Sequence, residues 1–213
     1  MPEVPLLILG AGTFAIETLE IAELDGGFAP VGFVVSERTP GIERLAGLPI
    51  FTAAAIPADL ARAQVVAGIV STRRRAFIEA MAGRGFTFAA LRHPSAVISP
   101  RARIAAGAVI GAGVIVASHT RVGAHVLLNR GANVGHDNVL EDYSTVSPGA
   151  TLAGAIQVGE GAYIGVGAVV RDHLAIGAGA IVAAGAVVVK PVEARTLVAG
   201  CPASVVRREV DPL

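Results

Sequence analysis

The C-terminal half of the chain carries a hydrophobic repeat with a period of six residues. Every sixth position is Val, Ile or Leu, at Ile98, Ile104, Ile110, Val116, Val122, Leu128, Val134, Leu140, Val146, Leu152, Val158, Ile164, Val170, Ile176, Val182 and Val188. This period fits neither an amphipathic helix nor the alternation of a half-buried strand. It is typical of a parallel β-helix, in which each repeat forms a short strand and a turn and three repeats complete one coil of about 18 residues.

Small residues recur between the aliphatic positions. Alanine stands four residues after many of them, at Ala102, Ala108, Ala132, Ala150, Ala162, Ala168, Ala180 and Ala186. We expect the aliphatic side chains to stack inside a triangular prism of just over five coils, with the alanines at its tight corners. The period does not determine the hand of the helix, although parallel crossovers are normally right-handed.

Upstream of His93 the six-residue period is absent and a different pattern predicts strands alternating with helices. The predicted strands are Val4–Leu9, Phe28–Val35, Gln64–Val70 and Phe86–Leu91, and the predicted helices are Phe14–Leu24 and Arg73–Ala82. Such alternation indicates an α/β domain with a parallel sheet. We therefore divide the chain into an α/β domain at 1–92, a β-helix at 93–192 and a C-terminal segment at 193–213.

The first predicted turn is a candidate phosphate site. Gly10-x-Gly12-x-x-Ala15 brings backbone amides and a helix N-terminus together, and a domain of this size has room for one nucleotide. The alternative is a glycine turn that serves only the chain reversal. The candidate substrate-binding residues of the domain are Gly10, Gly12, Thr13, Phe14, Ser36, Ser71, Thr72 and Arg73.

Three arginines, Arg73, Arg74 and Arg75, open the second predicted helix. Cations there oppose the positive end of the helix dipole, so a bound diphosphate would offset them, with Ser71 or Thr72 as the N-cap. The alternative is a solvated basic turn balanced by Glu79.

Composition excludes several kinds of partner. Seventeen Lys and Arg balance seventeen Asp and Glu, which gives no indication of nucleic acid or an anionic membrane. The mean hydropathy of +0.65 comes from Ala, Val, Ile and Gly, and the apolar stretches Ile104–Ser118 and Leu174–Val189 are shorter than a membrane span. With a single cysteine, Cys201, and no basic leader in Met1–Val4, we expect a soluble, cytoplasmic protein.

Polar residues concentrate in the repeats between Asn129 and Pro148. An 18-residue coil stacks His136 on Gly154, and stacked coils lie about 4.8 Å apart. A neutral imidazole can take a proton from a nucleophile, a carboxylate such as Asp137 can orient it, and an amide N–H can stabilise an oxyanion. His136, Asp137 and Gly154 are therefore candidates for direct acyl transfer, against the alternatives of a surface histidine and a turn aspartate.

Five short motifs carry a family resemblance: Gly135-His136-Asp137, Ser147-Pro148-Gly149-Ala150, Ala153-Gly154, Ile164-Gly165 and Gly200-Cys201-Pro202-Ala203. With them the chain resembles the hexapeptide-repeat sugar O- and N-acyltransferases of the sialic-acid and bacillosamine type, which include nucleotide-amino-sugar N-acetyltransferases. The resemblance implies a left-handed β-helix and a homotrimer with acetyl-CoA between neighbouring subunits.

The same resemblance implies roles for single residues. His136 would be the general base, Asp137 would increase its basicity, and the Gly154 amide would contact the thioester oxygen. The residues implied to contact the coenzyme are Thr145, Gly154, Val166, Ala184, Gly200 and Pro202. The N-terminal domain departs from the family pattern at Thr13-Phe14 and at Val34-Val35-Ser36, so the nucleotide base stays open.

We expect an acetyl-CoA-dependent transferase that acts on an amino group of a nucleotide-linked amino sugar, without a metal. A sugar hydroxyl is the alternative acceptor. A zinc hydratase similar to the gamma-type carbonic anhydrases needs three converging histidines, a spacing that His119, His125, His136 and His173 lack. A non-catalytic, nucleotide-responsive scaffold is a further alternative.

Overall fold

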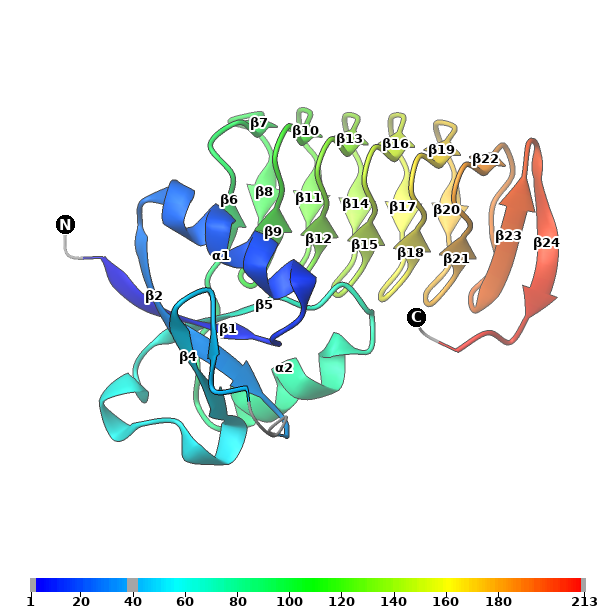
Figure 1. Cartoon of the computed structure of the whole chain (residues 1–213). Helices are drawn as coiled ribbons and strands as arrows, with labels where there is room; N and C mark the ends of the chain where they lie inside the picture. The colour runs from blue at the N-terminus through cyan, green and yellow to red at the C-terminus, as the bar shows by residue number, and fades with distance from the viewer. Residues whose placement is uncertain (1–2, 38–41, 212–213) are drawn as a thin grey trace.

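The computed structural model describes residues 3–37 and 42–211. The chain forms a small α/β domain, a three-sided solenoid and a terminal hairpin (Figure 1). The predicted first domain includes residues 1–2 and 38–41, and the predicted tail includes residues 212–213; these residues lie outside the described ones. No helix among the described residues is long and apolar enough to cross a membrane.

The N-terminal domain has a five-stranded sheet with the order β3-β4-β2-β1-β5. Its strands are β1 (Val4–Leu9), β2 (Phe28–Val35), β3 (Arg44–Leu45), β4 (Leu48–Thr52) and β5 (Gln64–Ala67). Its helices are α1 (Thr13–Asp25), the 3-10 helices η1 (Ala53–Ala55) and η2 (Ala58–Leu60), and α2 (Arg74–Gly83). All strand pairs are parallel except β3 with β4, so the predicted parallel sheet is confirmed.

Two parts of this domain differ from the prediction. β3 and β4 were not predicted, because Pro49 interrupts a short apolar run and a proline removes a ladder donor. The predicted strand Phe86–Leu91 is reduced to a bridge between Val65 and Phe88, after which Leu91–Arg92 forms β6. β6 pairs with β9, so the pairing of the solenoid begins two residues before the predicted boundary.

The solenoid has three parallel faces built from two-residue strands, which we number in the order that the chain visits them. Face 1 contains β7 (Val97–Ile98), β10 (Ile115–Val116), β13 (Asn133–Val134), β16 (Thr151–Leu152), β19 (Val169–Val170) and β22 (Val187–Val188). Face 2 contains β8 (Arg103–Ile104), β11 (Arg121–Val122), β14 (Val139–Leu140), β17 (Gln157–Val158) and β20 (Ala175–Ile176). Face 3 contains β6, β9 (Val109–Ile110), β12 (Leu127–Leu128), β15 (Thr145–Val146), β18 (Tyr163–Ile164) and β21 (Ile181–Val182), and continues into the hairpin of β23 (Thr196–Gly200) and β24 (Ala203–Arg208).

Each strand points one residue outward and its sixth-position aliphatic inward. Ile110, Leu128, Val146 and Ile164, for example, are completely buried and stack in one core. The corner alanines from Ala108 onward join the same core, and Ala102 at the first coil is partly buried. The predicted parallel β-helix is confirmed, and its three-faced form is consistent with a left-handed β-helix.

The N-terminal domain packs on face 3 of the first coils (Figure 1). Leu6, Ile8 and Leu19 share a hydrophobic cluster with Val109 and Leu127 of the solenoid. At the margin of this contact, Arg130 Nη1 lies 3.2 Å from Glu17 Oε2.

A buried arginine ties α2 to the solenoid. The Arg74 guanidinium donates hydrogen bonds to the carbonyls of His125 at 2.9 Å, Tyr143 at 2.9 Å and Ser144 at 3.1 Å, and to Thr145 Oγ1 at 3.0 Å. Burial lowers the pKa of Arg74 to about 10. Since both terminal nitrogens of the guanidinium find acceptors on the solenoid, the buried cation fixes the position of the domain on face 3.

His125 makes the stability of the fold depend on pH. Its ring stacks on Tyr143 with centroids 5.1 Å apart, and its pKa lies below the ordinary value, first because of burial and then because of the Arg74 charge. In the unfolded chain the imidazole is protonated as the pH falls through about 6.5, whereas in the folded chain it stays neutral to a lower pH. The free energy of unfolding that His125 contributes therefore falls as the pH drops below about 6.5.

We expect His125→Asn to reduce the loss of Tm between pH 7.5 and pH 5.5 relative to the unsubstituted protein. Asparagine suits the left-handed backbone of this position, where φ is 57°. The measurement is thermal unfolding at both pH values. Equal losses in the two proteins would contradict the assignment of this pH dependence to His125.

Candidate active site

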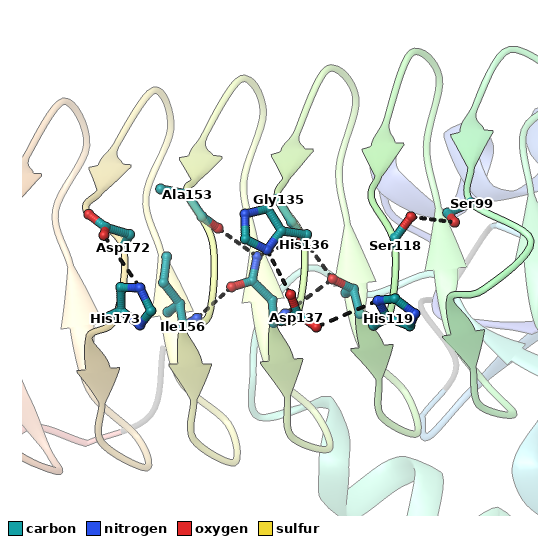
Figure 2. A network of polar contacts seen from close by, with 12 residues as sticks. Ser99, Ser118, His119, Gly135, His136, Asp137, Ala153, Ile156, Asp172 and His173 are labelled. Atoms are coloured by element: carbon teal, nitrogen blue, oxygen red, sulfur yellow. Dashed lines mark hydrogen bonds and ion pairs between the residues drawn. The ribbon is translucent and has the colours of Figure 1, made fainter.

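His136 and Asp137 lie on the edge of the prism between faces 1 and 2, in the turn from β13 to β14. Nδ1 of His136 is 2.8 Å from Asp137 Oδ2, and both side chains are more than half exposed (Figure 2). With an ionised carboxylate, Nδ1–H donates and Nε2 keeps its lone pair for a proton. Asp137 occupies the left-handed region with φ 57°, as do His119 and His173 at the equivalent corners, and Asp and His are enriched in this conformation.

Gly154 lies on the next coil, beside the imidazole. Ala155 N–H donates to the His136 carbonyl at 2.9 Å, which fixes the two coils in register. A Cβ on Gly154 would lie 2.6 Å from Cε1 and Nε2 of His136. Among the described residues, none accepts a hydrogen bond from the Gly154 N–H. The structure thus brings together the three residues that the coil length placed in one group.

We expect Gly154→Ala to lower kcat by about 10- to 100-fold while Tm changes little. The new methyl group must push the exposed imidazole aside, and a displacement of about 1 Å can cost a rate factor of that size. The measurement is steady-state kinetics beside thermal unfolding. Gly83→Ala, where a Cβ meets nothing within 4 Å, is the matched control. Unchanged kcat in Gly154→Ala would show that the imidazole does not need its present position.

A buried polar network holds this corner. Asn138 is fully buried and donates through Nδ2 to the carbonyls of Gly135 at 3.0 Å and Ala153 at 2.8 Å, while its Oδ1 accepts from Ile156 N–H at 2.7 Å. Thr120 Oγ1 donates to the same Gly135 carbonyl at 2.7 Å. These two residues stand where eight of the sixteen repeats have alanine, and neither was predicted to take part in the site. They rigidify the turn that carries His136.

The residues assigned to the coenzyme lie mainly on a different edge, between faces 3 and 1. Val166 and Ala184 are exposed there on successive coils, since Gly185 N–H donates to the Val166 carbonyl at 2.8 Å. Gly200 ends β23 at the hairpin, and the exposed Pro202 follows in its turn. In one chain, these residues do not share an edge with His136.

The position of the Thr145 side chain differs from the expectation. Thr145 was expected to line the coenzyme groove, but its side chain is fully buried under α2 and its hydroxyl accepts a hydrogen bond from Arg74. The expectation was wrong because Thr145 points outward on face 3 where the N-terminal domain covers that face.

The candidate substrate residues of the N-terminal domain gather at one edge of its sheet. Gly10, Gly12 and Thr13 follow β1, Ser36 follows β2, and Ser71–Arg73 follows β5. Because β1 lies between β2 and β5, the carboxyl ends of the three parallel strands meet at a topological switch point, where open α/β sheets bind ligands. Position 10 favours glycine because its φ is 97°, in the left-handed region. The Gly10 N–H donates a hydrogen bond to the Val34 carbonyl at 2.8 Å.

Two details at this sheet edge differ from the expectation. Phe14 packs against the cluster that joins α1 to the solenoid. The N-cap of α2 is Arg73, and neither Ser71 nor Thr72 takes that place, although Ser71 Oγ accepts from the Arg73 N–H at 3.2 Å. Of the arginine run, Arg74 is buried and Arg75 pairs with Glu79 at 2.7 Å and also with Glu160.

The two groups of candidates face different directions in a single chain. The N-terminal domain covers face 3, whereas His136 lies on the edge opposite that face, between faces 1 and 2. The sheet edge of the domain and the imidazole of the same chain are therefore separated by the prism. Within residues 3–37 and 42–211, no three His, Cys, Asp or Glu side chains gather as a metal site would require.

Solved structures match nearly the whole chain. Perosamine N-acetyltransferase from Caulobacter crescentus, as a histidine-to-asparagine variant with CoA and GDP-perosamine, is 29% identical with a TM-score of 0.86 over 94% of this chain and 96% of that one. The acetyltransferase domain of PglB from Neisseria gonorrhoeae, with acetyl coenzyme A, is 30% identical with a TM-score of 0.85 over 96% and 100%. WeeI from Acinetobacter baumannii is 28% identical with a TM-score of 0.85 over 94% and 99%. No protein-family model matches the chain.

The solved structures that match this parallel β-helix and its N-terminal domain identify the chain as a hexapeptide-repeat acyltransferase. Both domains take part in the match, because the coverage extends over almost the full length of this chain and of its relatives. The chain belongs to the family of hexapeptide-repeat nucleotide-amino-sugar acetyltransferases.

Proposed function

We propose that the chain transfers the acetyl group of acetyl-CoA to an amino group of a nucleotide-linked amino sugar. One observation carries this function: the imidazole of His136, paired with Asp137, lies beside the Gly154 amide. A relative that binds GDP-perosamine and CoA and a relative that binds acetyl coenzyme A support the choice of substrates.

The chemistry needs a base and an oxyanion donor, and this edge offers both. The sugar amine attacks the thioester carbonyl while Nε2 of His136 accepts the proton that the nitrogen loses. The Gly154 N–H donates to the oxygen on which negative charge develops. When the carbonyl reforms, the carbon–sulfur bond breaks and the proton on His136 can pass to the leaving thiolate. The products are the amide and free coenzyme A.

We also propose that the enzyme is a homotrimer, because one chain leaves the site incomplete. Face 1 carries the exposed apolar residues Val97, Ile115 and Val169 and is bounded by both edges that bear site residues. If three copies turn face 1 toward a common axis, the His136 edge of each copy meets the Val166 edge of the next. A coenzyme held there would contact Val166, Ala184, Gly200 and Pro202 of one copy and Gly154 of the other.

The same arrangement supplies the acceptor. It places face 3 of one copy beside face 2 of its neighbour, so the N-terminal domain on face 3 lies next to the neighbour's His136 edge. The sheet edge with Gly10, Gly12 and Ser36 would then hold the nucleotide, with Ser71–Arg73 as further contacts. The exposed free thiol of Cys201 fits a cytoplasmic location, which we include in the proposal.

The test is a panel of UDP-, GDP- and dTDP-linked 3-amino and 4-amino sugars with acetyl-CoA, read as release of free thiol. Acetylation of at least one amino sugar supports the proposal, and activity only on the corresponding hydroxyl sugars would show an O-acetyltransferase. If no sugar reacts and millimolar acetyl-CoA does not raise Tm, a scaffold is favoured over an enzyme.

A further inference from the structure

Three arginines and a histidine border an open hollow at the first coils of the solenoid. The hollow has a volume of about 880 Å³ and is lined by Arg101, Arg103, Arg121 and His119, together with Pro100 and Ala102. Arg101 and His119 stand on the His136 edge, whereas Arg103 and Arg121 point outward from face 2. All four side chains that line the hollow carry nitrogen atoms that can donate hydrogen bonds.

The strand register brings two like charges together on face 2. Arg103 of β8 pairs directly with Arg121 of β11, and neighbouring strands lie about 4.8 Å apart. Equal charges at adjacent positions repel each other. Within residues 3–37 and 42–211, no carboxylate lies within ion-pair distance of Arg101, Arg103 or Arg121. The arginines that do pair with a carboxylate include Arg75, Arg130, Arg171, Arg195 and Arg208. Arg103 and Arg121 also border a second hollow, of about 520 Å³, whose lining includes Glu141, Asp142 and Glu160. None of these three carboxylates lies within ion-pair distance of Arg103 or Arg121.

The hollow is continuous with the catalytic edge. His119 Nδ1 lies 3.7 Å from Oδ1 of Asp137, whose other oxygen holds His136 (Figure 2). The coenzyme candidates Val166, Ala184 and Gly200 all lie further toward the C-terminal end of the solenoid. The hollow and these coenzyme candidates thus lie on opposite sides of His136, so the hollow is on the side that remains for the acceptor sugar.

We propose that Arg103 and Arg121, with Arg101, bind the diphosphate of the nucleotide-linked sugar. This inference rests on the proposed function and on its trimer, in which face 2 of one copy adjoins the N-terminal domain of the next. The neighbour's domain holds the nucleoside end, the arginines hold the diphosphate, and the sugar amine reaches His136. Guanidinium groups form paired hydrogen bonds to phosphate oxygens, and the diphosphate neutralises the repulsion between the two arginines.

The test compares Arg103→Gln/Arg121→Gln with the unsubstituted enzyme in steady-state kinetics. Glutamine keeps a hydrogen-bonding side chain but removes the charge, so we expect the acceptor KM to rise by about 10- to 100-fold while the acetyl-CoA KM stays within about twofold. The control is Arg62→Gln/Arg171→Gln, which removes two exposed charges outside the hollow and should leave the acceptor KM within about twofold. The acceptor KM of the unsubstituted enzyme should also rise more steeply with salt than that of the double variant.

An unchanged acceptor KM in the double variant would overturn the inference. A rise confined to the acetyl-CoA KM would also overturn it, because it would assign the arginines to the coenzyme phosphates. Loss of the trimer in size-exclusion chromatography would overturn it as well, because it would assign the arginines to an interface. Calorimetric titration with inorganic pyrophosphate separates this inference from the proposed function. If no sugar is acetylated but pyrophosphate binds and the double variant abolishes that binding, the hollow is a phosphate site and the proposed function is wrong. Equal pyrophosphate binding by both proteins would refute the hollow as an anion site.

Discussion

Replacing His136 by asparagine is expected to lower kcat by at least about 100-fold, the usual contribution of a general base. Asparagine can still hydrogen-bond to Asp137 but cannot accept the proton of the attacking amine. The side chain is 66% exposed and supports no core contact, so the fold and the assembly should persist. The measurement is thiol release at saturating acetyl-CoA, with size-exclusion chromatography and thermal unfolding on the same samples.

His173→Asn is the matched control for this variant. His173 is an exposed histidine on the same edge, two coils beyond Asp137 at the equivalent left-handed corner, with φ 58°, and its Nε2 lies 3.7 Å from Asp172 Oδ2. We expect its kcat to stay within about twofold of the unsubstituted enzyme. If His136→Asn keeps more than a third of the activity, the base is another group and the assignment fails.

Replacing Arg74 by methionine is expected to lower the free energy of unfolding by about 3 kcal/mol, because the change leaves buried acceptors without donors. The carbonyls of His125 and Tyr143 and the hydroxyl of Thr145 lose the donor that Arg74 provides, and water has little access to replace it. The Ser144 carbonyl keeps only its bond from the Leu127 N–H. For a chain of this length the corresponding fall in Tm is about 6 to 12 °C.

Arg75→Met is the control for Arg74→Met. Its side chain is 52% exposed and its ion pairs with Glu79 and Glu160 lie at the surface, where solvent screens them. We expect its Tm to stay within about 2 °C of the unsubstituted protein. Equal losses in the two variants would mean that Arg74 acts only as another surface charge.

The group of His136, Asp137 and Gly154 illustrates what a periodic sequence makes predictable. His136, Asp137 and Gly154 could be placed together because a β-helix repeats the same geometry every coil, so sequence separation converts into distance. The structure agrees in detail, with Ala155 N–H bonded to the His136 carbonyl at 2.9 Å. Thr120 and Asn138 were also open to prediction, because polar residues at the alanine position must find buried partners.

The position of the N-terminal domain was not predictable in this way. The contact between Arg74 and Thr145 joins residues 71 positions apart in sequence, and no period relates them. From the sequence, Arg74 was expected to belong to a basic run that binds a diphosphate or is solvated, and Thr145 was expected to line an open groove. Only the docking of α2 on face 3 shows that one is buried and that the other is covered.

The sequence by itself determined the β-helix, the stacking of its coils and the residues that meet along each edge, because these follow from a repeat that is local and regular. The tertiary structure decided which face the N-terminal domain covers, which edge each half of the site occupies and which arginines are left without a carboxylate. Those features depend on side chains that meet only after the chain has folded, and for that reason a single chain separates His136 from the sheet edge of its own N-terminal domain.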